Sequence, residues 1–390
     1  MTDEVLVRAE HICKYFKIGG GRMLHAVEDI NLDIHRGETL GLVGESGCGK
    51  STLGRTLMGI YQPTKGKLVY DGRPVDLSNK KDRFAFAKKA QIVFQDPYAS
   101  LDPRMTVGSI IEEGMIIHNM YDAKRRQERV AELLATVGLN REHANRFPHE
   151  FSGGQRQRVA IARALEIEPE LIVCEEPISA LDVSIQAQVI NLLHDLQERM
   201  GLTYLFIAHD LNIVKYISDR IAVMNKGVIQ QIGTPHHIYS RPANVFVATF
   251  IGHSNLFHAT LSKKDGRTEL CFPSGYRLPM TTLSDECTDG QEVVVGIRPE
   301  EFSVSSEGLT CDVLNRTFLG RYSNYFLHFA DGMCVPDQPS IEFSQDLGHT
   351  QTLYQPGDHL TLRPNPDKIN VFTADMEKSL LKDVIRYEQA

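Results

Sequence analysis

The chain has 390 residues, of which 42% are hydrophobic and 24% charged, a balance typical of globular proteins. Because one hydrophobic core seldom organises that many residues, two domains are expected. The net charge of −8 disfavours nucleic acid as a partner, and no run reaches the roughly 18 apolar residues of a membrane span. Seven scattered cysteines without a CxxC pair, and an N-terminus unlike a signal peptide, favour a cytoplasmic protein with reduced thiols.

Strand-like and helix-like segments alternate through the first 240 residues. Strand-like apolar runs occur at residues 5–7, 30–34, 39–43, 171–174 and 202–208. Residues 107–146 have helical character and form an insertion between the two halves of the expected sheet. The alternation predicts an α/β fold with a largely parallel sheet.

The pattern changes after about residue 240. Short strand-like segments at residues 293–297, 325–329 and 359–362 are separated by stretches rich in Gly, Pro, Asp and Ser. This spacing predicts a small all-β barrel or sandwich. The tail from about residue 375 has the pattern of a short helix.

One loop has the composition of a phosphate-binding site. Residues 44–51, GESGCGKS, match the pattern GxxxxGK[ST] between a predicted strand and a predicted helix. Glycines let backbone N–H groups turn toward phosphate oxygens, and the helix presents its positive end. The pattern predicts that Lys50 contacts the β- and γ-phosphates and that Ser51 ligates Mg²⁺. Cys48, beside the helix N-terminus, is expected to have a lowered thiol pKa and to be alkylated readily.

Two acids follow the predicted strand at residues 171–174. Glu175 and Glu176 are delivered by that buried strand to the edge of the sheet. One acid is expected to hold the hydration shell of Mg²⁺, and the next to polarise an attacking water.

Together these motifs resemble the ATPase subunits of ATP-binding cassette (ABC) transporters. Residues 151–155 (FSGGQ) are similar to the signature loop of that family, and residues 179–182 (SALD) to its D-loop. Gln95 resembles the Q-loop glutamine, His209 the switch histidine, and Phe16 the aromatic residue that stacks on adenine. The implied fold is an α/β P-loop NTPase with a helical subdomain at about residues 105–165.

The resemblance also implies site residues and cofactors, ATP and Mg²⁺. The implied catalytic residues are Glu176 and His209, and the implied metal residues are Ser51, Gln95 and Glu175. The implied ATP-binding residues are Phe16, Gly44, Glu45, Ser46, Gly47, Cys48, Gly49, Lys50, Ser51, Thr52, Gln95, Ser152, Gly153, Gly154, Gln155 and Asp182.

Two branches of the family are resembled by different parts of the chain. Residues 94–104, 144–150 and 181–188 are similar to the oligopeptide, dipeptide and nickel importer branch. Residues 241–252 and 296–300 (GIRPE) resemble the linker and the accessory OB-like domain, called TOBE, of polyamine, sugar and iron importer ATPases. The implied organisation is an ATPase domain at 1–240, a linker at 241–252, a TOBE-like domain at 253–375, and a C-terminal helix or tail at 376–390.

The chain departs from the family at Glu175, where the family has Asp. The extra methylene displaces the carboxylate by about 1.5 Å, the length of one carbon–carbon bond. Because the family's contact to Mg²⁺ usually runs through water, the longer acid is expected to be tolerated and the enzyme to be active.

The resemblance implies an ATP-hydrolysing subunit of a binding-protein-dependent importer at the cytoplasmic face of the cell membrane. The implied partners are two integral-membrane permease subunits, a second ATPase subunit (a copy or a paralogue) and, indirectly, an extracytoplasmic substrate-binding protein; nucleic acid is not expected. Peptides are the favoured cargo, with polyamines, sugars, iron or nickel as alternatives. The remaining alternative is a soluble ABC ATPase without a transport role, which usually needs tandem ATPase domains or a coiled-coil insertion.

Overall fold

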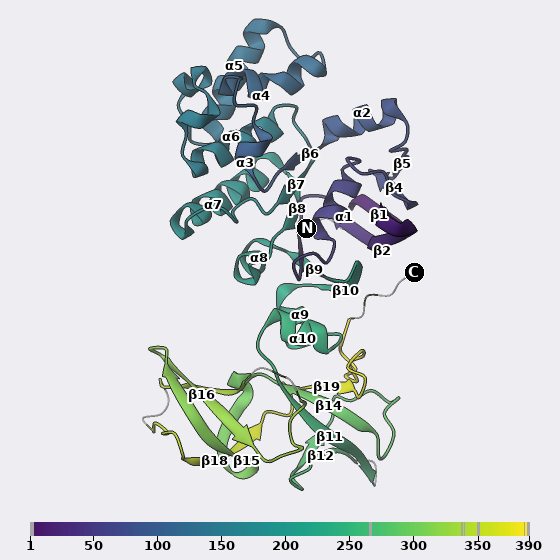
Figure 1. Ribbon diagram of the computed structural model, residues 1–390, viewed down its shortest axis with the longest axis vertical. Coiled ribbons are helices and arrows are strands. Elements are labelled where there is room, and N and C mark those ends of the chain that lie inside the picture. Colours follow the sequence, from purple (N-terminus) through teal and green to yellow (C-terminus); the bar gives the residue numbers. More distant parts are fainter. Residues whose placement is uncertain are drawn as a thin grey trace. The chain divides into compact units, whose positions relative to one another are not determined.

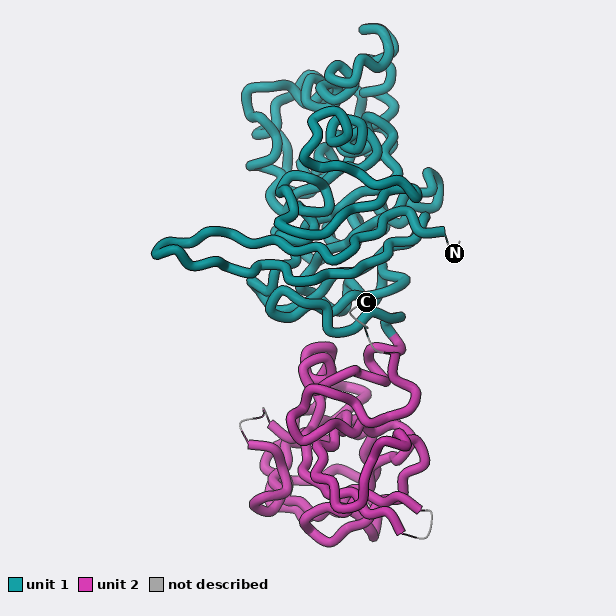
Figure 2. The backbone as a smooth tube through the Cα atoms, turned by 90° about the vertical axis from the view of Figure 1, so that its right-hand side faces the viewer, with its two compact units in different colours: residues 1–235, 387–390 teal, residues 236–386 magenta. Residues whose placement is uncertain are grey.

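The computed structural model describes residues 4–264, 267–336, 338, 340–348, 352–385 and 387. The chain divides into two compact units, residues 1–235 with 387–390, and residues 236–386 (Figure 2). Among the described residues, no helix is both long and apolar enough to cross a membrane.

A six-stranded sheet forms the centre of the first unit. Its strand order is β10-β9-β3-β8-β7-β6, and only β10 runs antiparallel. Three of its strands are buried along their whole length, which explains their unbroken apolar sequence. The strands are β3 (Thr39–Gly44), β6 (Ala90–Val93), β7 (Leu171–Glu175), β8 (Thr203–Ile207), β9 (Arg220–Asn225) and β10 (Val228–Gly233).

A second, antiparallel sheet has the order β2-β1-β4-β5. Strands β1 (Val5–Ile18) and β2 (Arg22–His35) form a long hairpin, visible in Figure 2 as the arm that extends from the teal unit. Gly20 and Gly21 have φ of 79° and 73° in its turn, a conformation that favours glycine. The other strands are β4 (Lys65–Tyr70) and β5 (Arg73–Val75).

The helices of this unit fall into two groups. Helices α4 (Val107–Ile117), α5 (Ala123–Thr136) and α6 (Gly153–Leu165) gather at one end of the unit and form the predicted helical insertion (Figure 1). Side chains cap these helices, for example Asp122 at α5, whose carboxylate accepts the N–H of Arg125. The remaining helices are α1 (Lys50–Leu57), α2 (Lys80–Lys89), α3 (Pro97–Ser100), α7 (Val183–Met200) and α8 (Leu211–Ile217).

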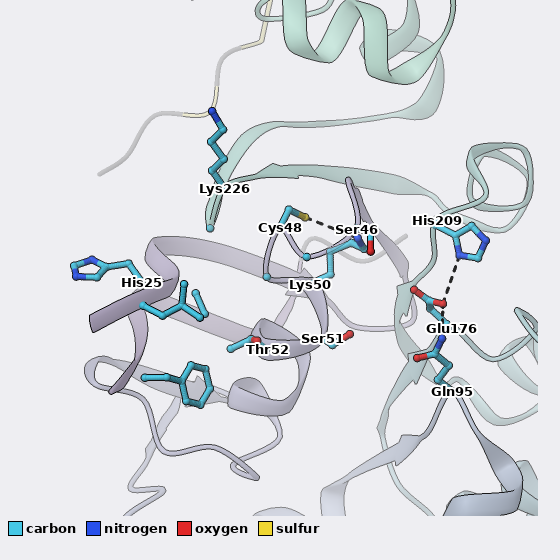
Figure 3. Close-up of a pocket in the computed structure, with 16 residues that line it drawn as sticks. His25, Ser46, Cys48, Lys50, Ser51, Thr52, Gln95, Glu176, His209 and Lys226 are labelled. Atoms are coloured by element: carbon cyan, nitrogen blue, oxygen red, sulfur yellow. Dashed lines mark hydrogen bonds and ion pairs between the residues drawn. The ribbon is translucent and has the colours of Figure 1, made fainter. Parts of the chain in front are cut away.

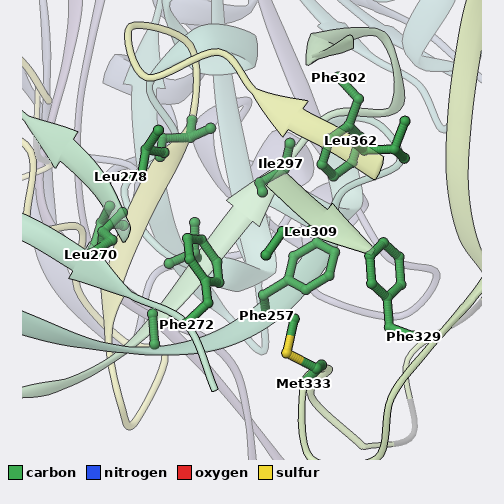
Figure 4. Close-up of a cluster of buried hydrophobic side chains, with 14 of the residues drawn as sticks. Phe257, Leu270, Phe272, Leu278, Ile297, Phe302, Leu309, Phe329, Met333 and Leu362 are labelled. Carbon is green, nitrogen blue, oxygen red and sulfur yellow. The ribbon is translucent and has the colours of Figure 1, made fainter. Parts of the chain in front are cut away.

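The second unit is built from two antiparallel sheets. One has the order β13-β12-β11-β14-β19 and the other β17-β16-β15-β18. Their strands are β11 (Asn255–Lys264), β12 (Arg267–Cys271), β13 (Arg277–Met280), β14 (Glu292–Ile297), β15 (Phe302–Phe318), β16 (Tyr322–Phe329), β17 (Ile341–Asp346), β18 (His359–Pro364) and β19 (Asn370–Thr373). Fully buried Phe257 lies at the centre of their shared core, with the rings of Phe272, Phe302 and Phe329 meeting it edge-on (Figure 4).

The segment expected to be a linker is folded onto this β-unit. It contains α10 (Val245–Ile251) and follows α9 (Pro235–Ser240). Arg298, 3% exposed, donates hydrogen bonds to the carbonyls of Ala248, Gly252, His253 and Tyr239, and its guanidinium lies 4.3 Å from the centre of the Tyr239 ring. The arginine of the GIRPE motif therefore fixes the linker to the barrel.

The predicted α/β and all-β regions are confirmed, and the predicted strands lie at the expected places. The helix expected after residue 375 is wrong for the described part of the tail. Residues 376–385 form turns and isolated bridges, because Leu381 pairs with Leu283 and Ser379 with Phe372 of the barrel. Backbone pairing to the sheets replaces the hydrogen bonds of a helix there.

Candidate functional site

A cavity of the first unit, about 870 Å³ in volume, lies at the carboxyl ends of the parallel strands. Ligands of open α/β sheets bind at this edge, because the loops that follow parallel strands all emerge there. The β1–β2 hairpin closes one side of the cavity (Figure 3). The lining residues are Phe16, Leu24, His25, Ala26, Ser46, Gly47, Cys48, Gly49, Lys50, Ser51, Thr52, Gln95, Glu176, His209, Lys226 and Gly227.

The loop after β3 has the shape of a phosphate cradle. A Cβ on Gly44 would lie 2.1 Å from the Met224 carbonyl oxygen, and one on Gly49, at φ 111°, would lie 2.2 Å from that of Ala26. Only glycine fits these two positions, and α1 begins directly after Gly49 with its N–H groups directed to the cavity. This geometry suits an anion.

Lys50 is held against the same loop. Its side chain is buried, and Nζ donates hydrogen bonds to the carbonyl oxygens of Gly44 and Glu45, both at 2.8 Å. These bonds satisfy the buried cation while leaving it within the cavity lining. Gly44 and Glu45 themselves contribute these carbonyls and do not line the cavity.

Cys48 lines the cavity, but the expectation that its thiol pKa is lowered is wrong. Its side chain is buried, and burial raises the pKa of the thiol, although the nearby Lys50 ammonium acts in the opposite direction. Desolvation of the thiolate therefore outweighs the helix N-terminus.

Three polar side chains from three different strand ends meet in the cavity. The Gln95 amide donates to Glu176 Oε2 at 2.9 Å, and His209 Nδ1 lies 3.5 Å from the same oxygen (Figure 3). The Glu176 backbone has φ of 43°, rare for a residue with a side chain, and its N–H donates to the Ile207 carbonyl at 2.8 Å. A strained backbone held by a neighbouring strand is common at functional sites.

Glu175 does not join this group. Its side chain is 2% exposed, and both carboxylate oxygens bind Arg55, Oε2 to Nε at 3.1 Å and Oε1 to Nη2 at 3.0 Å. The structure therefore contradicts the expectation that Glu175 faces the metal position. The physical reason is the extra methylene, which lets the acid reach a guanidinium that binds it at two points.

The remaining donors fit a magnesium ion. The Ser51 hydroxyl and the Gln95 side chain both line the cavity and offer oxygen ligands, which Mg²⁺ prefers. Glu176 adds a carboxylate to the same cavity. Ser51 and Gln95 are thus the residues that could hold the metal together with phosphate oxygens.

Phe16 lines the cavity, beside two residues that the sequence did not reveal. Phe16 pairs with Leu24 across the β1–β2 hairpin, and Leu24 and His25 also line the cavity. Tyr61 meets Phe16 edge-on at 5.5 Å. The triple glycine at 19–21 could have revealed Leu24, because a hairpin turn there places it opposite Phe16.

The signature-like loop lies outside the cavity. Ser152 caps α6: the Gln155 N–H donates to Ser152 Oγ, and the Ser152 N–H donates to Gln155 Oε1 at 3.0 Å. Ser152, Gly153, Gly154, Gln155 and Asp182, the N-cap of α7, are absent from the cavity lining. Within one chain, the structure does not bring these residues to the phosphate cradle.

A phosphate cradle at the end of a parallel strand, with an acid, an amide and an imidazole opposite, defines a P-loop nucleotide-binding protein. Comparison with known proteins agrees: the family described as "ABC transporter" matches residues 27–179, and the TOBE domain matches residues 295–372. The dimeric structure of the ATP-binding cassette MJ0796 with ADP and Pi is similar, with a TM-score of 0.54 and 31% identity over 59% of this chain and 98% of that chain.

Similar curated sequences include ATP-binding proteins of peptide transport systems. The oligopeptide transport ATP-binding protein OppF of Bacillus subtilis is 54% identical over 64% of this chain and 82% of its own length. The dipeptide transport ATP-binding protein DppF of Haemophilus influenzae is 46% identical over 64% of this chain and 80% of its own. The chain belongs to the ATP-binding proteins of ABC transporters and is an ABC ATPase with a TOBE domain.

Proposed function

We propose that this chain hydrolyses ATP as the energising subunit of a peptide importer. One observation carries the proposal: the cradle and its polar side chains are assembled in one cavity, whereas the signature loop is capped and lies apart from it. An ATPase built this way needs a second subunit to supply the missing loop. The similarity to OppF and DppF supports peptides as the cargo.

Six side chains of the cavity then have a proposed role. The loop N–H groups and Lys50 bind the phosphates, and Phe16 stacks on the base. Glu176 orients the attacking water and accepts its proton, while His209, held beside the same carboxylate, positions the water against the γ-phosphate. Ser51 and Gln95 would hold Mg²⁺, which would supply positive charge to offset that of the phosphate oxygens.

The signature loop would act on the nucleotide of the partner subunit, a second copy or a paralogue. The first backbone N–H groups of α6, at Gly153 and Gly154, and the positive end of the helix dipole would face a γ-phosphate. Two nucleotides would lie between the two subunits, and hydrolysis would remove the γ-phosphate that holds them together. The permease subunits would respond to that reopening at the cytoplasmic face of the membrane.

Steady-state ATP hydrolysis by the assembled transporter tests the chemistry. The Glu176→Gln variant should hydrolyse ATP about 10²- to 10⁴-fold more slowly while it still binds the nucleotide. Equal rates for the wild type and the variant would refute the assignment of Glu176.

Co-purification with integral-membrane subunits tests the assembly. Thermal-shift screening of the associated binding protein against peptides and polyamines tests the cargo. Stabilisation by polyamines alone would overturn the peptide proposal in favour of the importers that the TOBE domain resembles.

A further inference from the structure

The contact between Arg55 and Glu175 is absent from the expected mechanism. Glu175 ends β7, and its backbone is fixed by pairing with Ile207 of β8. Arg55 lies on α1, four residues after Ser51 and so on the same face of the helix. The acid at the end of the strand is thus attached to the helix one turn below the hydroxyl that could hold the metal.

The buried carboxylate of Glu175 needs the charge of Arg55 to be stable in the folded protein. A carboxylate with 2% exposure is strongly unfavourable unless it is paired and hydrogen-bonded. Arg55 supplies two parallel hydrogen bonds and a full positive charge, the arrangement in which arginine binds carboxylates best. Within the described residues, both oxygens of Glu175 are engaged in this way, and the acid is neutralised locally.

Arg55 is itself held in place. Its Nη1 lies 3.4 Å from the Tyr61 hydroxyl, and the Tyr61 ring packs against Phe16. The guanidinium is therefore held by two partners, Glu175 and Tyr61.

We propose that Arg55 is a positioning residue that holds the Glu175 carboxylate away from the divalent cation, which Ser51 and Gln95 then bind without it. The longer acid is what makes this possible, since an aspartate at 175 would reach about 1.5 Å less far toward Arg55. The inference rests on the proposed ATP site, because the cation is expected to enter with the nucleotide.

The test measures Mn²⁺ affinity by electron paramagnetic resonance on the full chain with ATP, in the Glu176→Gln background so that turnover does not interfere. Glu175→Gln should change the Mn²⁺ Kd by less than about threefold, because the acid is already neutralised. Loss of an acid that helps hold the metal costs about 10- to 100-fold. A loss of that size would overturn the proposal.

Two further variants separate positioning from simple support of the fold. Glu175→Asp should bind Mn²⁺ about tenfold tighter, because the shorter acid is released from Arg55 toward the metal position. Arg55→Gln should also tighten binding, and the gain should vanish in the double variant Arg55→Gln/Glu175→Gln. If the double variant still bound Mn²⁺ more tightly, the gain would come from removing the charge of Arg55 alone. That result would refute the proposed positioning of Glu175.

Thermal unfolding of the same variants without nucleotide keeps this test separate from the proposed function. Either single change should lower the melting temperature by about 4 °C or more, and the double variant by no more than either one, because the two residues are coupled. If the fall in melting temperature of the double variant equalled the sum of the two single falls, Arg55 and Glu175 would not be coupled. Arg55→Lys retains the charge, so its melting temperature should fall less than that of Arg55→Gln. Lys67→Gln is the matched control, because Lys67 forms an exposed ion pair with Glu10. If the wild type bound no ATP, the proposed function would fail. The melting temperatures of the single and double variants would still show whether Arg55 and Glu175 are coupled.

Discussion

Two helix N-termini in the first unit look alike in sequence and differ in what surrounds them. The loop before α1 is enclosed by β1, β2 and the ends of the central strands, and its lysine is already in place. The loop before α6 is closed on itself by the Ser152–Gln155 capping box and does not line that cavity. Under the proposed function, the first N-terminus binds the nucleotide of its own chain, and the second would meet the nucleotide of a partner.

The largest expected effect separates the two loops by nucleotide binding. Lys50→Ala should weaken ATP binding about 100-fold, because a buried cation that meets phosphate is lost. Fluorescent-nucleotide titration of the isolated chain measures this. Lys67→Ala, which removes an exposed lysine on β4, is the control and should bind normally.

The signature loop should behave in the opposite way. A Cβ on Gly154 would lie 2.5 Å from Ile185 Cγ2, so Gly154→Ala requires the Ile185 side chain or the start of α6 to shift. A displacement of this kind should slow ATP hydrolysis by the assembled transporter about 10- to 100-fold. ATP affinity of the isolated chain should stay unchanged, and a parallel loss of affinity would contradict the separation of the two loops.

The other end of α6 carries a buried acid that makes the helical insertion sensitive to pH. Glu166 is 5% exposed and accepts the N–H of Gly114 in α4 at 3.1 Å. Burial raises the pKa of Glu166 to about 8, against the opposing charge of Arg163. The folded chain therefore holds a proton that the unfolded chain releases above about pH 4.3, and the free energy of unfolding falls as pH rises toward 8.

Glu166→Gln should abolish this fall in the free energy of unfolding at high pH. The variant should gain about 2 kcal/mol over the wild type between pH 6.5 and pH 8 in urea unfolding. Glu168→Gln, an exposed acid two residues away, is the control and should follow the wild type. A wild type that becomes more stable than Glu166→Gln as pH rises would show that the acid is ionised when folded.

The smallest expected effect tests the capping box. Ser152→Ala removes the side chain that accepts the Gln155 N–H, and N-cap losses of this kind destabilise a protein by about 1 kcal/mol. Chemical unfolding of the isolated chain gives the value. A change below about 0.2 kcal/mol would show that the box contributes nothing before a partner binds.

The sequence alone predicted the parts of the site whose geometry is local. The cradle at 44–51 and the acid at 176 follow directly from strand ends, so their positions depend only on the parallel order of β3 and β7. The partner of Glu175 could not be predicted in the same way. Its identity depends on how α1 packs on β7, which places Arg55 within reach of the longer acid.

The C-terminal region shows the same limit. Its strands were visible as apolar segments between turns, but the tail was expected to be helical. Ser379 and Leu381 instead form isolated bridges to the β-unit. The partner of Leu381, Leu283, is distant in the sequence, and the partner of Ser379, Phe372, lies across a turn. The role of Arg298 was equally hidden, because its four carbonyl acceptors belong to a segment that looks like a plain connection.

That arginine has a practical consequence for exchanging domains among transporter ATPases. Its acceptors begin at Tyr239, so a barrel transplanted from residue 253 onward would carry a buried guanidinium with none of its native acceptors before His253. A graft that starts at residue 236 keeps α10 and all four carbonyls with the barrel. The exchangeable module therefore includes the connection, and its length is set by one side chain.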